Sequence, residues 1–132
     1  MSEHDNQRVV QSVYEAFGRG DAAGVLAACA EDINWNIHGP EVVPYFGLRR
    51  GHQGVIEFLT QIGGAVEFED FQVRELIPYG DRVIVLGHER GRVRATGKTF
   101  NNEWAMCFTL RGGKITDLRS YEDTAAVAEA FS

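Results

Sequence analysis

Two glutamates in the second half of the chain, Glu89 and Glu103, are the residues best suited to acid–base chemistry. They lie on either side of a turn signal, Thr96-Gly97-Lys98, between two stretches with the alternating pattern of β-strands. The hairpin that this turn predicts places the two side chains nearly opposite each other. A carboxyl in an apolar hollow tends to keep its proton, and a second carboxyl nearby strengthens that tendency. Such a pair would suit general acid or base catalysis near neutral pH.

A structural interpretation of the same glutamates stays open, because arginines are close to them in the sequence. Both carboxylates could lie near the rim of a hollow and form ion pairs with Arg90, Arg92 or Arg94. Structural ion pairs also perturb carboxyl pKa values, so the residue types alone do not separate the two interpretations.

His38 is the third candidate catalytic residue. It follows an alternating stretch and opens a long loop, where an imidazole that titrates at about pH 6.5 could carry protons. The alternative is a turn histidine that binds the loop backbone. The four histidines are scattered without HxH or HxxxH spacing, so we expect no metal. No phosphate-binding loop or other cofactor motif is visible, so we expect no cofactor.

Several aromatic residues could form the wall of a site for a flat apolar ligand. They are Trp35, Tyr45, Phe46, Trp104 and Tyr121. The alternative is ordinary packing in the core or at an interface, which is the better interpretation for Trp104 and its neighbours Met106 and Phe108.

The elements that would position these residues follow from periodicity and turn residues. Helices are expected at 2–19, where Ser2 and Asp5 could form a capping box, at 21–29 behind the cap Asp21, around 55–62 before Gly63-Gly64, and after Asp123 or Thr124. Strands are expected at 33–37, 69–78, 82–95, 99–110 and 114–122, with a long loop at 38–51. The order α-α-β-α-β-β-β-β predicts an α+β fold. In it, one curved antiparallel sheet wraps around three to four helices and leaves a cone-shaped hollow.

Composition restricts the class of protein. The 132 residues suit a single domain, 1–132, with 44% hydrophobic and 24% charged residues. The net charge of −6 argues against nucleic acid as a partner, and no apolar run is long enough to span a membrane. The acidic, polar start is unlike a signal peptide, and Cys29 and Cys107 lie far apart. We therefore expect a cytoplasmic protein with reduced thiols.

Six short segments, in this order, resemble the nuclear transport factor 2-like superfamily, and most closely its SnoaL-like branch of ketosteroid isomerase-related proteins. The segments are 14–21 (YEAFGRGD), 31–35 (EDINW), 45–51 (YFGLRRG), 96–98 (TGK), 113–115 (GKI) and 121–124 (YEDT). The resemblance covers nearly the whole chain and implies the same cone-shaped fold.

The resemblance does not carry a complete catalytic set to this chain. The general-base aspartate of ketosteroid isomerases falls at Ile37, and their oxyanion-hole aspartate falls at Ala105. Their oxyanion-hole tyrosine falls at Val13, with Tyr14 one residue away. The acidic residue that polyketide cyclases and limonene epoxide hydrolases share on the last strand falls at Ser120. The cyclase histidine falls near Glu89. Because the three ketosteroid isomerase roles are empty here, steroid isomerisation is not expected.

The resemblance also implies which way the strands face. If Ile37, Ala105 and Ser120 line the cavity, alternation places Trp35, Glu103, Cys107, Leu118 and Glu122 there too, with Val85, Glu89, Gly91 and Val93 on the preceding strand. Trp104, Met106 and Phe108 would then face outward beside Ile84 and Leu86. An outward apolar stripe needs cover, so we expect a homodimer through the outer face of the sheet.

Together these observations predict a SnoaL-like protein that binds a small hydrophobic or aromatic molecule in its cavity. It would be a cofactor-free isomerase, cyclase or hydratase. The expected catalytic residues are Glu89, Glu103 and His38, and the expected substrate-binding residues are Trp35, Tyr14, Tyr45, Ser120 and Tyr121. The alternative is a non-catalytic binding or dimerisation domain with a vestigial cavity. A buried carboxyl without an arginine partner favours the enzyme, and an ion-paired Glu89 favours the alternative.

Overall fold

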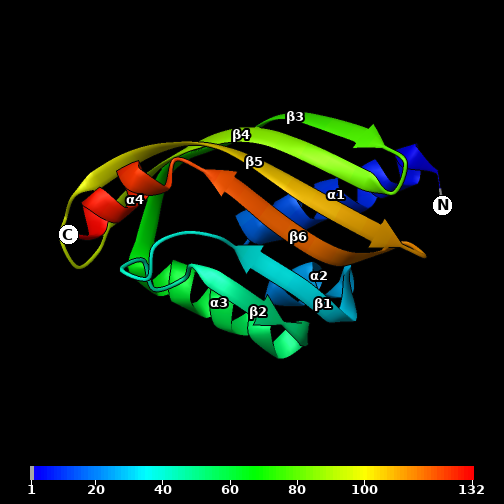
Figure 1. Cartoon of the computed structure of the whole chain (residues 1–132), viewed down its shortest axis with the longest axis horizontal. Coiled ribbons are helices and arrows are strands. Elements are labelled where there is room, and N and C mark those ends of the chain that lie inside the picture. Colours follow the sequence, from blue (N-terminus) through cyan, green and yellow to red (C-terminus); the bar gives the residue numbers. More distant parts are fainter. Residues whose placement is uncertain (1) are drawn as a thin grey trace.

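The chain folds as a curved six-stranded sheet whose concave face is covered by helices (Figure 1). The computed structural model describes residues 2–132. Its elements are α1 (Glu3–Gly18), α2 (Ala22–Ala27), β1 (Cys29–Ile37), β2 (Gly47–Arg50), α3 (Gly51–Ala65), β3 (Val66–Tyr79), β4 (Arg82–Val93), β5 (Thr99–Arg111), β6 (Lys114–Glu122) and α4 (Thr124–Phe131). The α+β architecture expected from the sequence is confirmed.

The strands lie in the order β2-β1-β6-β5-β4-β3, which leaves β2 and β3 as the two edges of an open sheet. Strands β3 to β6 form the predicted antiparallel meander. Strand β1 lies parallel to β6, which differs from the wholly antiparallel sheet that we expected. No tight turn joins these two strands, so turn chemistry does not set their relative direction.

Side-chain caps begin three of the helices as the sequence indicated. Ser2 and Asp5 form the capping box of α1, and Asp21 accepts a hydrogen bond of 2.9 Å from the backbone N–H of Gly24. Asp123 caps α4 in the same way. Because each cap fixes where a helix begins, these short polar residues set the entry angle of the chain into the concave face.

Two local predictions were wrong. Helix α3 does not end at Gly63-Gly64, since neither glycine has a positive φ, and the helix continues to Ala65 before the backbone turns extended at Val66. The loop at 38–51 contains the short strand β2, which pairs with β1 from Asn34 to Ile37. Four residues with no fully buried member give too little alternation to reveal a strand.

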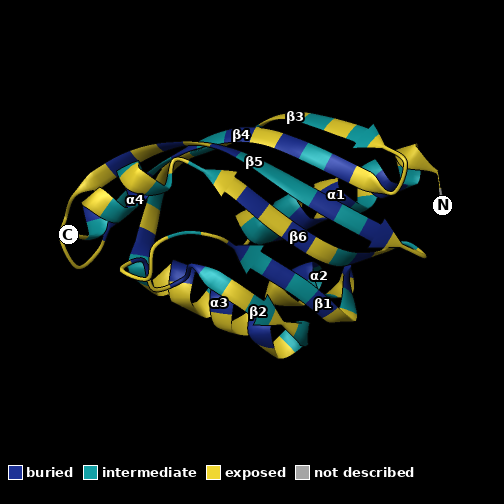
Figure 2. Cartoon of the chain, in the orientation of Figure 1, coloured by how far each residue is buried: buried dark blue, intermediate teal, exposed yellow. Residues whose placement is uncertain are grey.

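The facing of β5 is the most consequential difference from the sequence analysis. Trp104 and Phe108 are buried on the concave side with Met106, whereas Glu103 is exposed. The family-based placement of Ala105 inside the cavity was therefore one residue out, and a shift of one residue reverses every side chain of a strand. Strands β4 and β6 have the expected facing, with Glu89 and Ser120 buried; Figure 2 shows their alternation.

A missing side chain on β4 accommodates the largest side chain on β5. Gly87 pairs with Trp104, and a Cβ at Gly87 would overlap the indole ring and lie 2.6 Å from the backbone oxygen of Gln72. The indole stacks on the ring of Tyr14 from α1, with centroids 5.7 Å apart and planes at 9°. This contact packs α1 against the middle of the sheet.

Within residues 2–132 no helix is long and apolar enough to cross a membrane. Both cysteines, Cys29 and Cys107, are free thiols.

The contact between Gly87 and Trp104 predicts a large effect from one methyl group. Gly87→Ala should lower the free energy of unfolding by about 1–3 kcal/mol, because the overlap forces the indole out of its place. The matched control is Gly63→Ala, whose added methyl meets nothing within 4 Å; in a helix interior it should raise stability by roughly 0.5–1 kcal/mol. Urea titration measures both, and an unchanged midpoint for Gly87→Ala would contradict this packing.

Candidate functional site

A narrow apolar cavity lies between helices α1 and α3 and the concave face of the sheet. Its volume is about 70 Å³, well below that of a typical ligand pocket. Aromatic side chains dominate its wall: Tyr14 and Phe17 from α1, Trp35 from β1, Tyr45, Phe58 from α3, Phe68 and Phe71 from β3, and Trp104 and Phe108 from β5. Two carboxyls, Glu89 and Glu122, are the charged groups that this wall includes.

Asn102 joins these two carboxyls. Its side-chain Nδ2 donates to Glu122 Oε1 at 2.8 Å and to Glu89 Oε2 at 3.4 Å. Its Oδ1 accepts from the backbone N–H of Asp123 at 3.0 Å, which fixes the orientation of the amide. Asn102 is completely buried, and it lies directly across from Glu89 in the sheet register. Three neighbouring strands, β4, β5 and β6, thus supply one polar cluster in an apolar cavity.

Burial makes the two carboxyls weak acids. Burial raises the pKa of Glu89 to about 8, with a further contribution from the nearby charge of Glu122, while the hydrogen bond from Asn102 opposes the rise. Burial also raises the pKa of Glu122, but hydrogen bonds from Asn102 and Ser120 favour its charged form. Glu89 is therefore the better proton donor of the pair, and Glu122 is the carboxyl whose charged form receives the stronger hydrogen bond. Within the described chain, no arginine or lysine forms an ion pair with Glu89.

Hydrogen-bonding atoms without a protein partner also gather around the cavity. Among the described residues, the indole N–H groups of Trp35 and Trp104, the hydroxyl of Tyr45 and Oε2 of Glu122 are buried and make no hydrogen bond. Burial and the two glutamates raise the pKa of Tyr14 well above its usual range, so its hydroxyl keeps its proton. Since an unsatisfied buried polar group costs about 1–3 kcal/mol, this arrangement suits a ligand that accepts several hydrogen bonds.

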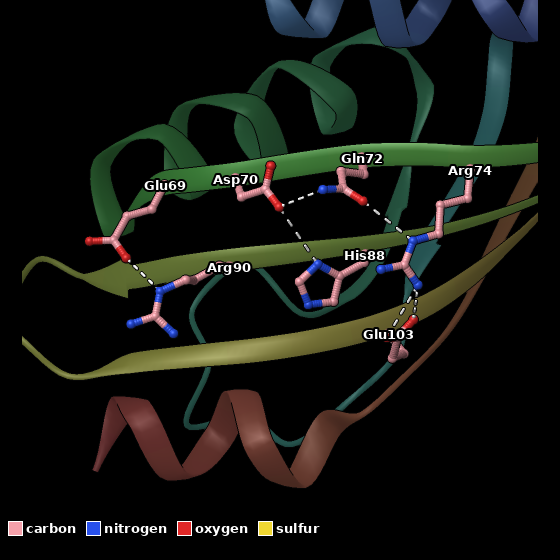
Figure 3. Close-up of polar contacts among 7 residues, drawn as sticks. All are labelled: Glu69, Asp70, Gln72, Arg74, His88, Arg90 and Glu103. Atoms are coloured by element: carbon pink, nitrogen blue, oxygen red, sulfur yellow. Dashed lines mark hydrogen bonds and ion pairs between the residues drawn. The ribbon is translucent and has the colours of Figure 1, made fainter.

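Glu103 does not lie in this cavity, so the predicted Glu89–Glu103 pair was wrong. Glu103 extends from the convex face of β5, where its carboxylate is 3.0 Å from Arg74 and its side chain is 70% exposed (Figure 3). Two further ion contacts share this face, between Arg90 and Glu69 at 2.9 Å and between His88 and Asp70 at 4.0 Å. Glu122 takes the place that we had given to Glu103. Alternation along β6 predicted that Glu122 faces the cavity. Glu103 was preferred as the partner of Glu89 because β5 was expected to face the other way.

The other predicted site residues divide into two groups. Trp35, Tyr14 and Tyr45 line the cavity, and Ser120 is buried next to it, accepting a 2.9 Å hydrogen bond from the backbone N–H of His38. The side chain of His38 is exposed and outside the cavity, so His38 does not lie with the two carboxyls. Tyr121 is 57% exposed on the convex face, where the guanidinium of Arg119 lies 5.0 Å from its ring centre. Its neighbours on β6 face inward, so alternation requires Tyr121 to face outward.

Comparison with models of protein families shows the family of the chain. The SnoaL-like domain matches residues 10–118. The chain belongs to the SnoaL-like family. Its fold is shared by an NTF2-like protein from Burkholderia xenovorans that is 39% identical, with a TM-score of 0.92 over 100% of this chain and 99% of the other.

Two further relatives match this SnoaL-like protein over almost its whole length. An uncharacterised protein of Mycobacterium tuberculosis is 25% identical over 99% of this chain and 98% of its own length. TerC, crystallised with polyporic acid, is 28% identical with a TM-score of 0.82, over 96% of this chain and 98% of its own. These likenesses establish the family and its fold, and they leave the activity of this member to be argued from its own site.

The raised pKa of Glu89 predicts that the free energy of unfolding of this SnoaL-like protein falls as the pH rises. Its folded pKa of about 8 lies above the ordinary value of 4.5, so the folded state holds a proton that the unfolded state releases between these values. Stability attributable to this group is full below about pH 4.5 and is lost as the pH rises through about 8. Glu89→Gln removes the loss, so relative to wild type it should gain up to about 4 kcal/mol between pH 5 and pH 8.5, at about 1.4 kcal/mol per pKa unit.

Urea titrations of both proteins at the two pH values measure this gain. The control is Glu103→Gln, which breaks only an exposed ion pair and should change stability by less than about 1 kcal/mol. A constant difference between wild type and Glu89→Gln at both pH values would show that Glu89 is not a neutral buried carboxyl.

Proposed function

We propose that this SnoaL-like protein is a cofactor-free acid–base enzyme that moves a proton on a small, neutral, apolar carbonyl compound. The Glu89–Asn102–Glu122 cluster carries the proposal, because it places a proton donor beside a carboxylate in an apolar, aromatic cavity. A buried carboxyl without an arginine partner is expected in an enzyme rather than in a scaffold. Within the described chain, Glu89 is such a carboxyl.

The chemistry follows from the different environments of the two carboxyls. The Glu122 carboxylate removes a proton from the carbon next to the substrate carbonyl, and the C–H electron pair becomes the C=C bond of an enol. The carbonyl oxygen takes up the Glu89 proton at the same time. In an unsaturated ketone, Glu122 returns its proton to a different carbon while the enol O–H proton goes back to Glu89, which gives an isomer. In ring closure, the enol C=C pair forms the new C–C bond and the π bond of a second carbonyl breaks. The oxygen of that carbonyl takes the proton from Glu122, and the enol O–H proton returns to Glu89. Each step conserves electrons and needs no oxidant or metal.

The unpartnered donors around the cavity support a carbonyl substrate. The indole N–H groups of Trp35 and Trp104 and the hydroxyl of Tyr45 are positioned to hold oxygen atoms of a ligand and to fix its orientation. The apolar wall favours a flat hydrocarbon body. The structural relatives include a Xanthomonas campestris protein that is provisionally described as a polyketide cyclase and is 25% identical, which is consistent with this reaction class.

A non-catalytic binding domain remains the second candidate, and two observations favour it. The cavity of about 70 Å³ is small for a complete metabolite. Two positions that the resemblance gives to catalytic groups of related enzymes hold Ile37 and Ser120 here. Proton-transfer activity distinguishes the enzyme from the binding domain, because a binding domain does not transfer protons to or from its ligand.

Exchange of carbon-bound hydrogen for deuterium tests the proposed enzyme without knowledge of its natural substrate. The probe is 1-indanone in D₂O, a flat neutral aryl ketone with hydrogens next to its carbonyl, followed by proton NMR. Wild-type protein should accelerate the exchange, and Glu89→Gln and Glu122→Gln should each reduce the protein-dependent rate by roughly 10²–10⁴. The rate should fall above about pH 8, where Glu89 loses its proton, and Glu89→Gln should lack this fall.

Glu103→Gln is the matched control for this experiment and should keep the wild-type rate. Equal exchange rates in wild type, Glu89→Gln and Glu122→Gln would contradict the proposed enzyme and favour the binding domain.

We further propose that the chain forms a homodimer through the convex face of the sheet. The support comes from apolar residues that differ from the expected stripe, since Trp104, Met106 and Phe108 face the cavity. Leu86, Ala105 and Tyr121 lie side by side across β4, β5 and β6, and Ile77 pairs with Ile84 beside them. Leu86 and Tyr121 are 36% and 57% exposed, and charged side chains such as Arg74 and Glu103 border them.

Light scattering at micromolar concentration should therefore give twice the chain mass of 14.7 kDa. Leu86→Arg should yield a monomer, because it would bury an unpaired charge at the interface. Leu48→Arg is the control; Leu48 is 52% exposed on the edge strand β2, so its replacement should leave the dimer intact. A wild-type monomer would refute the proposed dimer.

A further inference from the structure

The buried cavity adjoins a much larger open cleft. The cleft has a volume of about 940 Å³ and is lined by α1, the N-terminal part of α2, α3 and the edge strand β3. Tyr14, Phe17, Phe68 and Phe71 belong to the walls of both spaces. The inner cavity is too small for a complete metabolite, whereas the cleft is large enough for one.

Three phenylalanines belong to the shared wall, which also includes Tyr14, Val25, Leu59 and Ile62. Phe71 lies 5.4 Å from Phe17 and 5.5 Å from Phe68 between ring centres, and Phe17 and Phe68 are 6.1 Å apart. Phe71 also contacts Trp104, whose ring centre is 5.5 Å away on the cavity side. All three phenylalanines are only half-buried, in contrast to the completely buried core of the sheet. We call this group the phenylalanine constriction.

A β-bulge creates the constriction. Phe68 and Phe71 are three residues apart, so in a regular strand they would face opposite sides of the sheet. The register of β3 against β4 shifts between Phe68 and Asp70, and the extra residue turns both rings to the concave side. Strand β3 is an edge strand with a neighbour on one side only, so its rings can shift with less disturbance than those of a central strand.

The opposite end of the cavity is closed. The ring of Tyr45 packs against Phe46, Phe58 and Phe131, with centres 5.2, 6.1 and 5.9 Å away. Val43, in the same loop, is completely buried. Helix α4 brings Phe131 to this end, and Figure 1 shows α4 at the far end of the molecule from the N-terminus. A ligand therefore meets fewer packed side chains at the phenylalanine constriction than at the α4 end.

The rim of the cleft indicates the charge of the ligand. Glu15, Asp21 and Glu67 line it together with Arg94. The guanidinium of Arg94 is already 3.5 Å from the carboxylate of Glu67, so along the described rim no cation is left to pair with an anionic ligand. The excess of carboxylates disfavours an anionic ligand, and the aromatic wall favours an apolar one without charge.

We propose that the cleft is the entrance and outer subsite of the buried cavity, and that Phe17, Phe68 and Phe71 form the constriction through which a neutral, elongated, apolar ligand passes. Only the small reactive end of the ligand then enters the cavity with Glu89 and Glu122, while its body occupies the cleft. The subsite rests on the proposed function for the chemistry of that reactive end, but the entrance stands on the geometry of the two spaces.

Binding kinetics of prodan test the entrance. Prodan is a neutral naphthyl ketone whose fluorescence reports transfer from water to an apolar site, and stopped-flow mixing gives its association rate constant. Phe71→Ala should raise this constant about tenfold, because the wild-type rings must move aside before entry and such steps slow association. The matched control is Phe46→Ala, which removes the same ring beside Tyr45 at the α4 end and lines neither space; it should leave the association rate constant within about twofold of wild type.

Other outcomes decide against the proposal. If Phe46→Ala accelerates association as much as Phe71→Ala does, the ligand enters at the α4 end. Failure of wild-type protein to bind prodan would also refute the subsite. Should Phe71→Ala unfold, Phe71→Leu keeps an apolar side chain and should accelerate association to a smaller degree. The readout needs no proton transfer, so the test of the entrance stands even if deuterium exchange shows no catalysis.

Discussion

The site depends on one amide that holds two buried carboxyls. Asn102 is completely buried, donates to Glu89 and Glu122 through the same nitrogen, and is itself fixed by the backbone of Asp123. Two carboxyls in an apolar cavity repel each other when both are charged, so the pair is stable only with a shared proton or a bridging donor. Asn102 supplies that donor, and its shorter bond to Glu122 favours the charge on that carboxyl.

The surrounding fold keeps this cluster dry. Tyr14, Trp104 and Phe71 stack in a layer that joins α1, β5 and β3 over the cavity. Gly87 is part of the same arrangement, since any side chain there would displace the indole of Trp104. Burial is the principal cause of the raised pKa of Glu89, so the aromatic layer is a cause of the acid–base character of the site as well as of its shape.

Much of the fold could be predicted from the sequence, but the identity of the second carboxyl could not. Helix caps and tight turns depend on residues close together in the chain, so Asp21 and the turn at Thr96-Gly97-Lys98 were informative. The pairing of β1 with β6 depends on distant contacts and has no local signal. The facing of β5 was inferred by alignment to other proteins, and an error of one residue exchanged Glu103 for Asn102 and Trp104. The bulge that turns Phe68 and Phe71 to one face is equally invisible to alternation.

The proposed chemistry requires Glu89 to be protonated at neutral pH. The most direct measurement is a pH titration of the carboxyl carbon of Glu89 by NMR, in protein labelled with ¹³C-glutamate and assigned with Glu89→Gln. A midpoint pKa near 8 is expected. It should fall when Glu122 is replaced by glutamine, because the charge of Glu122 helps to raise it. A midpoint near the ordinary value of 4.5 would contradict a neutral carboxyl in the cavity and, with it, the proposed proton donor.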